Sequence, residues 1–172
     1  MQQQALPVVI VVIFIATLAQ LELDTEPLVA RRSVTLPRPK DEAFQMITNI
    51  HKFEKWMTTV VHVAEDDGSL AKVGKSFRLY TRTPLKTLEV PAAITKYQPI
   101  SSFEFETQSL LFSTRFVFDV EHGDRDGFSR LTWKIYARRR SYLYLVTVVQ
   151  PLKFILSNHV TASLLSLKVL LN

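Results

Sequence analysis

Apolar and polar residues alternate through most of the chain after residue 31. Such alternation, combined with many β-branched and aromatic residues, is typical of half-buried β-strands. The segments that show it are Arg32–Leu36, Thr59–Ala64, Lys75–Thr83, Thr87–Tyr97, Ser102–Gln108, Phe112–Glu121 and Ser129–Arg139. Because these strands have one apolar and one polar face, and because the connections are short, the pattern predicts an antiparallel meander.

Turn residues separate the predicted strands. Asp66, Asp67 and Gly68 favour a tight turn, and so does the segment His122–Gly127. Pro91 lies inside a predicted strand, where it has no N–H to donate to a neighbour. It therefore predicts an edge position or a bulge at that point.

Helical spacing replaces the alternation after the first strand. Pro39 suits the first turn of a helix, because the first helical N–H groups have no partner within the helix. Apolar residues then recur at helical spacing as far as Ile50, and Asn49 and His51 break the pattern. A second short helical turn is predicted at Phe53–Met57.

A long apolar helix is predicted to close the chain. From about Pro151 to Leu171 the apolar residues form a wide helical stripe with a thin polar side. Such a helix is not stable alone in water, so it must cover the concave side of the sheet or lie on another apolar surface. The elements together predict an α+β fold, with about six or seven strands wrapped around the closing helix and one or two short helices after the first strand.

The N-terminus is an unbroken apolar run from Leu6 to Ala19. It is shorter than the roughly 20 residues that a membrane-spanning helix needs. The small residues Thr17 and Ala19 fit a signal-peptide cleavage site before Gln20, although the four residues that begin the chain carry no Lys or Arg.

These features predict a signal peptide or an N-terminal membrane anchor at residues 1–19, and a buried element of the fold is the remaining alternative. Residues 20–30 then form a linker, and residues 31–172 form the domain. We accordingly expect the protein to be secreted or membrane-anchored.

Composition excludes several chemistries. The chain has no cysteine, which rules out disulfide scaffolds, thiol nucleophiles and cysteine-ligated zinc. Its four histidines, His51, His62, His122 and His159, do not pair at metal-ligand spacing, and no Gly-x-Ser-x-Gly, phosphate-binding or dinucleotide-binding motif is present. We therefore expect no metal, no cofactor and no established catalytic set.

The net charge of +5 suits contact with anionic lipid or nucleic acid. A basic stripe follows the last predicted strand and consists of Arg130, Lys134, Arg138, Arg139 and Arg140. Binding of single-stranded RNA needs aromatic residues on the same exposed face, and only Tyr136 is available there. The stripe favours an anionic membrane surface over nucleic acid, with a simply solvated face as the alternative.

Four local patterns carry a family resemblance. They are Leu36–Phe44 continuing to Phe53 and Trp56, Val73–Phe77, Ile94–Pro99 followed by Phe103 and Phe105, and Leu164–Lys168. Over residues 31–172 the chain resembles the START-like, polyketide cyclase-like superfamily (SRPBCC), also known as the Bet v 1-like or helix-grip fold. The chain departs from the family in its hydrophobic leader and in the low charge of its closing helix.

The resemblance implies a hydrophobic cavity between the sheet and the closing helix. Members of the family bind lipids, sterols, quinones, hormones or polyketide intermediates, and some are enzymes. The residues expected to bind a ligand here are Trp56, Phe77, Leu79, Leu88, Val90, Phe103, Phe105, Phe116, Phe118, Trp133, Leu156 and His159. The same residues also fit the core of a protein without a cavity.

Three hypotheses follow from the sequence. In the first, a monomeric binding module holds a lipid, sterol or quinone in the cavity as a carrier or sensor. In the second, a polyketide cyclase or dehydratase-like enzyme uses the same cavity, with an acid–base pair drawn from His159, Tyr80, Tyr97, Arg78, Arg82 and Arg115. In the third, the domain has a solid core and a structural or interaction role.

Overall fold

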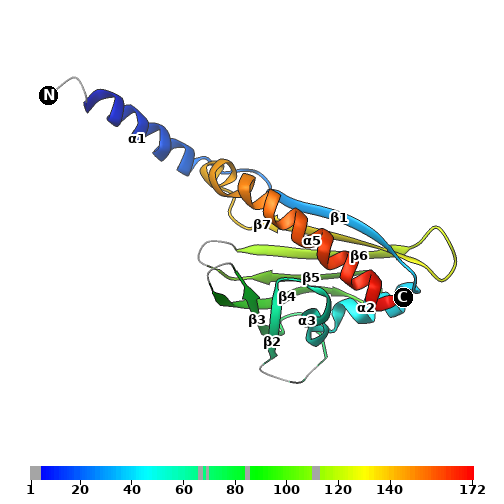
Figure 1. Cartoon of the computed structure of the whole chain (residues 1–172). Helices are drawn as coiled ribbons and strands as arrows, with labels where there is room; N and C mark the ends of the chain where they lie inside the picture. The colour runs from blue at the N-terminus through cyan, green and yellow to red at the C-terminus, as the bar shows by residue number, and fades with distance from the viewer. Residues whose placement is uncertain (1–4, 66–67, 69, 84–85, 110–112) are drawn as a thin grey trace.

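A computed structural model of the chain describes residues 5–65, 68, 70–83, 86–109 and 113–172. Seven strands form one sheet, with helices before, between and after them (Figure 1). The strands are β1 (Leu28–Leu36), β2 (Val60–Glu65), β3 (Ser76–Arg82), β4 (Thr87–Gln98), β5 (Ser102–Thr107), β6 (Thr114–His122) and β7 (Ser129–Ala137).

The helical segments fall into three groups. The helix α1 (Ala5–Gln20) comes first. Between β1 and β2 lie α2 (Lys40–Thr48), the 3-10 turn η2 (Ile50–Lys52) and α3 (Phe53–Trp56). After β7 come α4 (Tyr142–Tyr144), the π-helical segment η3 (Leu145–Val149) and α5 (Gln150–Leu171).

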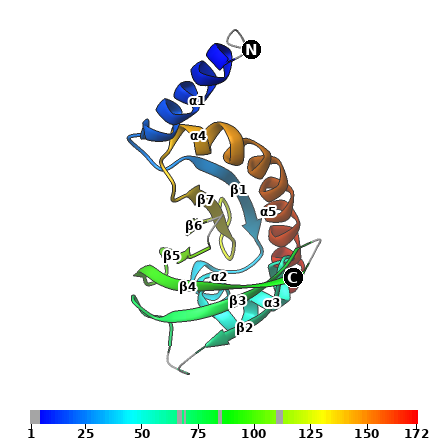
Figure 2. The same ribbon diagram turned by 90° about the vertical axis from the view of Figure 1, so that its left-hand side faces the viewer.

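The predicted antiparallel meander is confirmed. The strand order is β1-β7-β6-β5-β4-β3-β2, so strands β2 to β7 pair with their neighbours in sequence. The first strand pairs antiparallel with the last one. The sheet is curved, and Figure 2 shows it bending from β1 round to β2.

The first strand is longer than the alternation predicted. It begins at Leu28 instead of Arg32, because its early residues pair with β7 and the carbonyl of Pro27 accepts a hydrogen bond from the N–H of Ala137 at 2.9 Å. The last residues of the expected linker therefore belong to the sheet. Phe112, predicted to start the sixth strand, lies outside the described residues, and so do Asp66 and Asp67.

Pro91 does not lie in an edge strand, because β4 is an interior strand of the sheet. It also pairs in regular register with Arg78 of β3, and the register shift in β4 falls later, between Ile94 and Lys96. The carbonyl of Pro91 accepts a hydrogen bond from Gln108 at 2.8 Å, just after the last residue of β5. The ring nitrogen faces the same side, where β5 has ended, so the missing donor disrupts no strand pairing.

The helices between β1 and β2 form as predicted. In α2, the acidic residues Asp41 and Glu42 lie in the first turn, which favours the positive end of the helix dipole. Ala43, Phe44 and Ile47 are buried on one face, and the helix ends at Thr48 with Asn49 as its C-cap. A short second helix, α3, then buries Phe53 and Trp56 against the sheet.

The closing helix is also confirmed, and it is longer than predicted. Tyr142 to Leu171 form one continuous helical stretch in which η3 precedes Pro151. Proline has no N–H to donate to the carbonyl four residues earlier, and a local change of hydrogen-bonding pattern relieves that defect. The helix packs along β1 and reaches α3, where Ser163 accepts a hydrogen bond from the N–H of Thr58 at 3.0 Å.

The core is an aromatic cluster between the sheet and the α2–α3 segment. Phe53 lies 5.7 Å from Phe105 and 6.3 Å from Phe77 between ring centroids. Trp56 lies 6.0 Å from Phe118 and 5.6 Å from Trp133. The short helices therefore fill one part of the concave face with aromatic side chains and leave the remainder to α5.

Candidate functional site

A cavity of about 290 Å³ lies between the concave face of the sheet and the first half of α5. The sheet contributes apolar side chains from several strands, including Leu79 and Val90. From the helix, Leu152 and Leu156 face it on the other side. The volume is close to the lower end of the range for small-molecule sites, which is roughly 300 to 1,000 Å³.

Most of the residues expected to bind a ligand surround this cavity. Its lining includes Leu79, Leu88, Val90, Phe105, Phe116, Trp133, Leu156 and His159. These residues come from five strands and from α5, and only the fold brings them together. Their assignment as ligand contacts stays a prediction.

The other four expected residues lie elsewhere. Trp56, Phe77, Phe103 and Phe118 are fully buried in the aromatic core and do not line the cavity. Phe77, Phe103 and Phe118 face the same side of the sheet as the lining residues, but side chains from α2 and α3, including Trp56 itself, cover that part. Tyr97, for example, packs between Phe44 of α2 at 5.6 Å and Phe103 at 6.3 Å.

Several residues that line the cavity were not predicted from the sequence. They include threonines at the rim of the cavity and two further residues of α5. The additional lining residues are Met57, Thr59, Val60, Thr81, Thr83, Thr107, Ser109, Thr114, Leu152 and Ile155. Arg82, considered from the sequence only for catalysis, also lines the cavity. Strand parity was an available signal, since Thr81 lies two residues after Leu79 and Thr107 two residues after Phe105, so each pair shares a face of the sheet. Selection by hydrophobicity left these threonines out.

Two buried threonines in the cavity wall, Thr107 and Thr114, are hydrogen-bonded to each other. The hydroxyl oxygens of Thr107 and Thr114 are 2.8 Å apart, and the N–H of Thr114 donates to the Thr107 hydroxyl at 3.2 Å. Polar groups that are already hydrogen-bonded do not require a polar ligand atom. The inner wall of the cavity is therefore suited to apolar contact.

No family model and no curated protein matches the chain. Solved structures do match it. A START superfamily protein from Mycobacterium smegmatis superimposes with a TM-score of 0.63 at 11% identity, over 85% of this chain and all of that chain (100%). Ginseng major latex-like protein 151 from Panax ginseng gives a TM-score of 0.65 at 13% identity, over 82% and 95% of the two chains.

A third match is the di-domain ARO/CYC StfQ from the steffimycin biosynthetic pathway, with a TM-score of 0.63 at 13% identity. It covers 84% of this chain and 50% of StfQ, so this chain spans half of that protein. The chain has the START-like helix-grip fold. Because the sequence identities are only 11% to 13%, these matches show a shared fold. The resemblance predicted from the sequence is therefore confirmed as a resemblance of fold.

Within this START-like domain, the cavity offers few groups for acid–base chemistry. Among the described lining residues only Arg82 and His159 are ionisable, and both side chains are exposed. The other residues considered for catalysis lie away from the cavity. Arg115 pairs with Glu26 at 2.9 Å, and Tyr80 packs beside His62 at 5.7 Å between ring centroids.

The described part of the chain contains no candidate metal site. There, no three His, Asp or Glu side chains gather in a way that could hold an ion. His62 is hydrogen-bonded to Glu54 at 2.9 Å, and His51 pairs with Glu65 at 3.0 Å. His51 and His62 thus each have one carboxylate beside them.

The basic stripe is partly neutralised by acidic neighbours. Lys134 pairs with Asp119 at 2.8 Å, and Arg138 pairs with Glu26 at 2.7 Å and with Glu106 at 3.3 Å. Arg139 lies over the ring of Tyr144 at 5.7 Å. Burial raises the pKa of Tyr144, and the positive charge of Arg139 opposes that shift.

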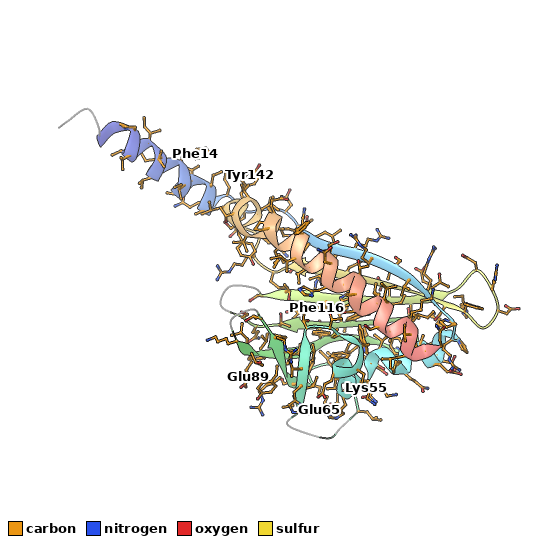
Figure 3. All side chains as sticks on the ribbon, viewed as in Figure 1. Phe14, Lys55, Glu65, Glu89, Phe116 and Tyr142 are labelled. Carbon is orange, nitrogen blue, oxygen red and sulfur yellow. The ribbon has the colours of Figure 1, made fainter. Side chains whose placement is uncertain are left out.

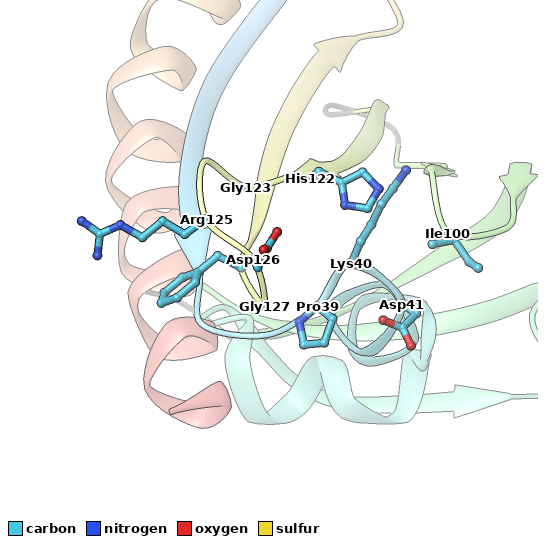
Figure 4. A pocket seen from close by; sticks show the side chains of 10 residues that line it. Pro39, Lys40, Asp41, Ile100, His122, Gly123, Arg125, Asp126 and Gly127 are labelled. Atoms are coloured by element: carbon cyan, nitrogen blue, oxygen red, sulfur yellow. The ribbon is translucent and has the colours of Figure 1, made fainter.

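A larger hollow of about 530 Å³ lies at the far end of the domain (Figure 4). The start of α2 and the β6–β7 loop form its walls. Its residues include Lys40, Asp41, His122 and Asp126, and the side chain of Arg125 points away from the others (Figure 4). This open, charged surface does not suit an apolar ligand, so we regard the cavity beneath α5 as the candidate site.

Two helices of the described chain are strongly apolar. The stretch from Tyr142 to Leu171 is long and apolar enough to cross a membrane by length and composition, although the core helix of a soluble protein can pass the same test. A shorter apolar helix covers residues Pro7–Gln20, within α1. In α5, Phe154, Leu165 and Val169 are exposed on the side that faces away from the sheet.

Proposed function

We propose that this START-like domain binds an apolar small molecule, such as a lipid, sterol or quinone, as a carrier or sensor. The observation that carries the proposal is an apolar cavity bounded by several strands and by α5. Burial of an apolar ligand there contributes about 25 cal/mol for each Å² removed from water, without any covalent step.

The size of the cavity indicates how a ligand would sit. At about 290 Å³ it accommodates a ring or part of a chain better than a whole diacyl lipid. Ile155 and His159 line the cavity and are also exposed, so it opens beside α5. We infer that the apolar end of the ligand enters and that its remainder extends through this opening.

The enzyme hypothesis has weaker support than the binding hypothesis. General acid–base catalysis usually requires an acid and a base positioned around the substrate. Among the described lining residues only Arg82 and His159 are ionisable, and none of them is a carboxylate. The geometry therefore favours a binding site over a catalytic one.

We also propose that residues 1–19 act as a membrane anchor or as a signal peptide. The support is the exposure of α1, whose side chains from Val8 to Ile15 are between 46% and 62% exposed. The intact mass of the protein isolated from cells separates the two roles. A chain that begins at Met1 supports the anchor, whereas a chain that begins near Gln20 supports cleavage.

The binding proposal is tested by native mass spectrometry of the purified full chain, followed by solvent extraction and identification of the compound released. We expect a stoichiometric apolar compound to copurify. L156W places a large side chain in the cavity wall, so this variant should lose the compound.

The matched control is L165W, which makes the same change on the exposed side of the same helix. This variant should retain the compound. The absence of any bound compound from the parent chain, or equal loss from both variants, would count against a site in this cavity.

A further inference from the structure

The rim of the cavity and the C-terminal end of α1, near Gln20, lie at the same end of the sheet; we call this end of the helix the base of α1. At this end β1 begins at Leu28 opposite Tyr136, and β6 begins at Thr114 opposite Ala137. The fifth strand ends at Thr107 opposite Thr114, and β3 ends where β4 starts. The polar rim of the cavity therefore lies at the same end as the junction between β7 and α4.

The segment that directly follows α1 is hydrogen-bonded to that junction. The N–H of Leu23 donates to the carbonyl of Arg140 at 2.7 Å, and the N–H of Tyr142 donates to the carbonyl of Leu21 at 2.9 Å. Glu22 and Ser141 form an isolated β-bridge between them. Figure 1 shows α1 projecting from this end of the molecule, and Figure 3 places Tyr142 beside its base.

The surface at this end is apolar and accessible. No charged residue occurs before Glu22, and α1 exposes apolar side chains such as Phe14, which is 62% exposed. On the adjoining helical stretch, Val146 is 52% exposed and Phe154 is 76% exposed. Exposed apolar surface of this extent typically marks an interaction site.

The distribution of charged residues indicates which kind of surface this end of the molecule contacts. No Asp or Glu follows Asp126 in the sequence. The cations beyond that point are Arg130, Lys134, Arg138, Arg139, Arg140, Lys153 and Lys168. Arg139 and Arg140 are exposed at the base of α1, and so are Glu22 and Asp24, so the charge there is mixed. The excess of cations in the stretch that follows Asp126 favours anionic phospholipid headgroups.

We propose that this end of the molecule docks on an anionic phospholipid bilayer. This docking rests on the anchor role of residues 1–19, since the chain must retain α1. In this arrangement α1 inserts into the hydrocarbon, Arg139 and Arg140 contact headgroups, and the first half of α5 meets the surface. The 16 residues of α1 span about 24 Å, and local thinning of the bilayer accommodates the difference from the usual thickness of about 30 Å.

Docking by this end has a consequence for the cavity. Its lining includes Arg82 and Thr83 at the end of β3 and Ile155 on the exposed side of α5, so its opening is directed to the membrane surface. This consequence rests on the proposed function, and it means that an apolar ligand exchanges directly with the bilayer. The docking itself does not depend on an occupied cavity.

The absence of cysteine allows a direct test. In the full chain, F154C and V169C each provide a single site for an environment-sensitive fluorophore. The two positions are similarly exposed on the same helix, at 76% and 73%, but Val169 lies near the C-terminal end. With vesicles of phosphatidylcholine and phosphatidylglycerol, we expect a blue shift and quenching by a lipid-borne spin label for F154C and neither effect for V169C.

The controls separate the parts of the proposal. Because α1 inserts into the bilayer, all variants should float with the vesicles in a density gradient. The blue shift of F154C should be abolished by the R139Q/R140Q substitutions, and also when the vesicles contain only phosphatidylcholine. Failure to float overturns the insertion of α1. If the blue shift is unchanged in R139Q/R140Q, the headgroup contact is overturned. If the labels at residues 154 and 169 respond equally, docking by this end is overturned. If neither label responds, contact of α5 with the membrane surface is overturned.

The same experiment distinguishes this inference from the proposed function. L156W changes the cavity wall and leaves the docking surface intact, so the response of F154C should persist in the L156W background. Loss of the bound compound with a retained blue shift supports both proposals. A retained compound without any blue shift overturns the docking and leaves the binding proposal intact.

Discussion

At the scale of single residues, two phenylalanines on neighbouring strands differ in their surroundings. Phe103 of β5 is completely buried among other rings of the core. Phe116 of β6 is half-buried, stacks on Phe105 at 4.7 Å and lines the cavity. The loss of each ring should therefore have a different effect on stability.

We expect F103A to lower the free energy of unfolding by about 4 kcal/mol, because it removes a fully packed ring and leaves a void in the core. F116A should cost about 2 kcal/mol or less, because the ring already borders an open space. Urea denaturation followed by circular dichroism measures both values. Equal losses would show that the cavity wall is packed as tightly as the core.

At the scale of elements, a buried ion pair joins the end of β2 to the start of β3. Lys75 contacts Glu65 at 2.6 Å, and their side chains are only 2% and 6% exposed. His51 of η2 lies 3.0 Å from the other oxygen of the same carboxylate. Charges so deeply buried require their partners, since an unpaired buried charge is costly.

We expect E65Q to lower the free energy of unfolding by about 3 kcal/mol, because it removes the charge of a deeply buried carboxylate that contacts both Lys75 and His51. E89Q is the matched control, since Glu89 pairs with Arg78 at 3.5 Å on an exposed surface and the loss should be under about 1 kcal/mol. Thermal and urea unfolding of the two variants compare the effects. A similar small loss in both would contradict a stabilising role for the buried pair.

At the scale of the whole molecule, ligand binding and stability should be coupled. A compound held in the native cavity and released on unfolding stabilises the folded state by mass action. At a free concentration of about one hundred times Kd, this contribution amounts to about 2.7 kcal/mol. The cavity wall spans strands from β2 to β7 as well as α5, so the effect should extend to cooperative unfolding of the domain.

We therefore expect solvent-extracted and refolded protein to melt at a lower temperature than the purified complex, and return of the extracted compound to restore the melting temperature. L156W should show no such recovery, whereas L165W should behave as the parent chain does. Differential scanning calorimetry measures the shifts. A melting temperature that does not depend on the compound would contradict specific binding to the native state.

The residue patterns predicted most of the elements. Alternation located the strands because a sheet with one buried face imposes a period of two, as in Ser102–Gln108 and the observed β5. The wide stripe after Pro151 likewise located the closing helix. The pattern did not find the early part of β1 or the helical segment at Tyr142–Val149, because tertiary contacts extend those elements beyond their periodic signals.

Local periodicity, acting through backbone geometry, determined that this chain forms a curved antiparallel sheet with a closing helix. Only the tertiary structure decided which inward-facing residues form the core and which border a cavity. Phe103 and Phe116 carry the same inward signal, but α2 and α3 cover the region of Phe103, and α5 leaves a space beside Phe116. Long-range packing makes that distinction, because a residue's own strand determines the face it occupies and not what lies opposite.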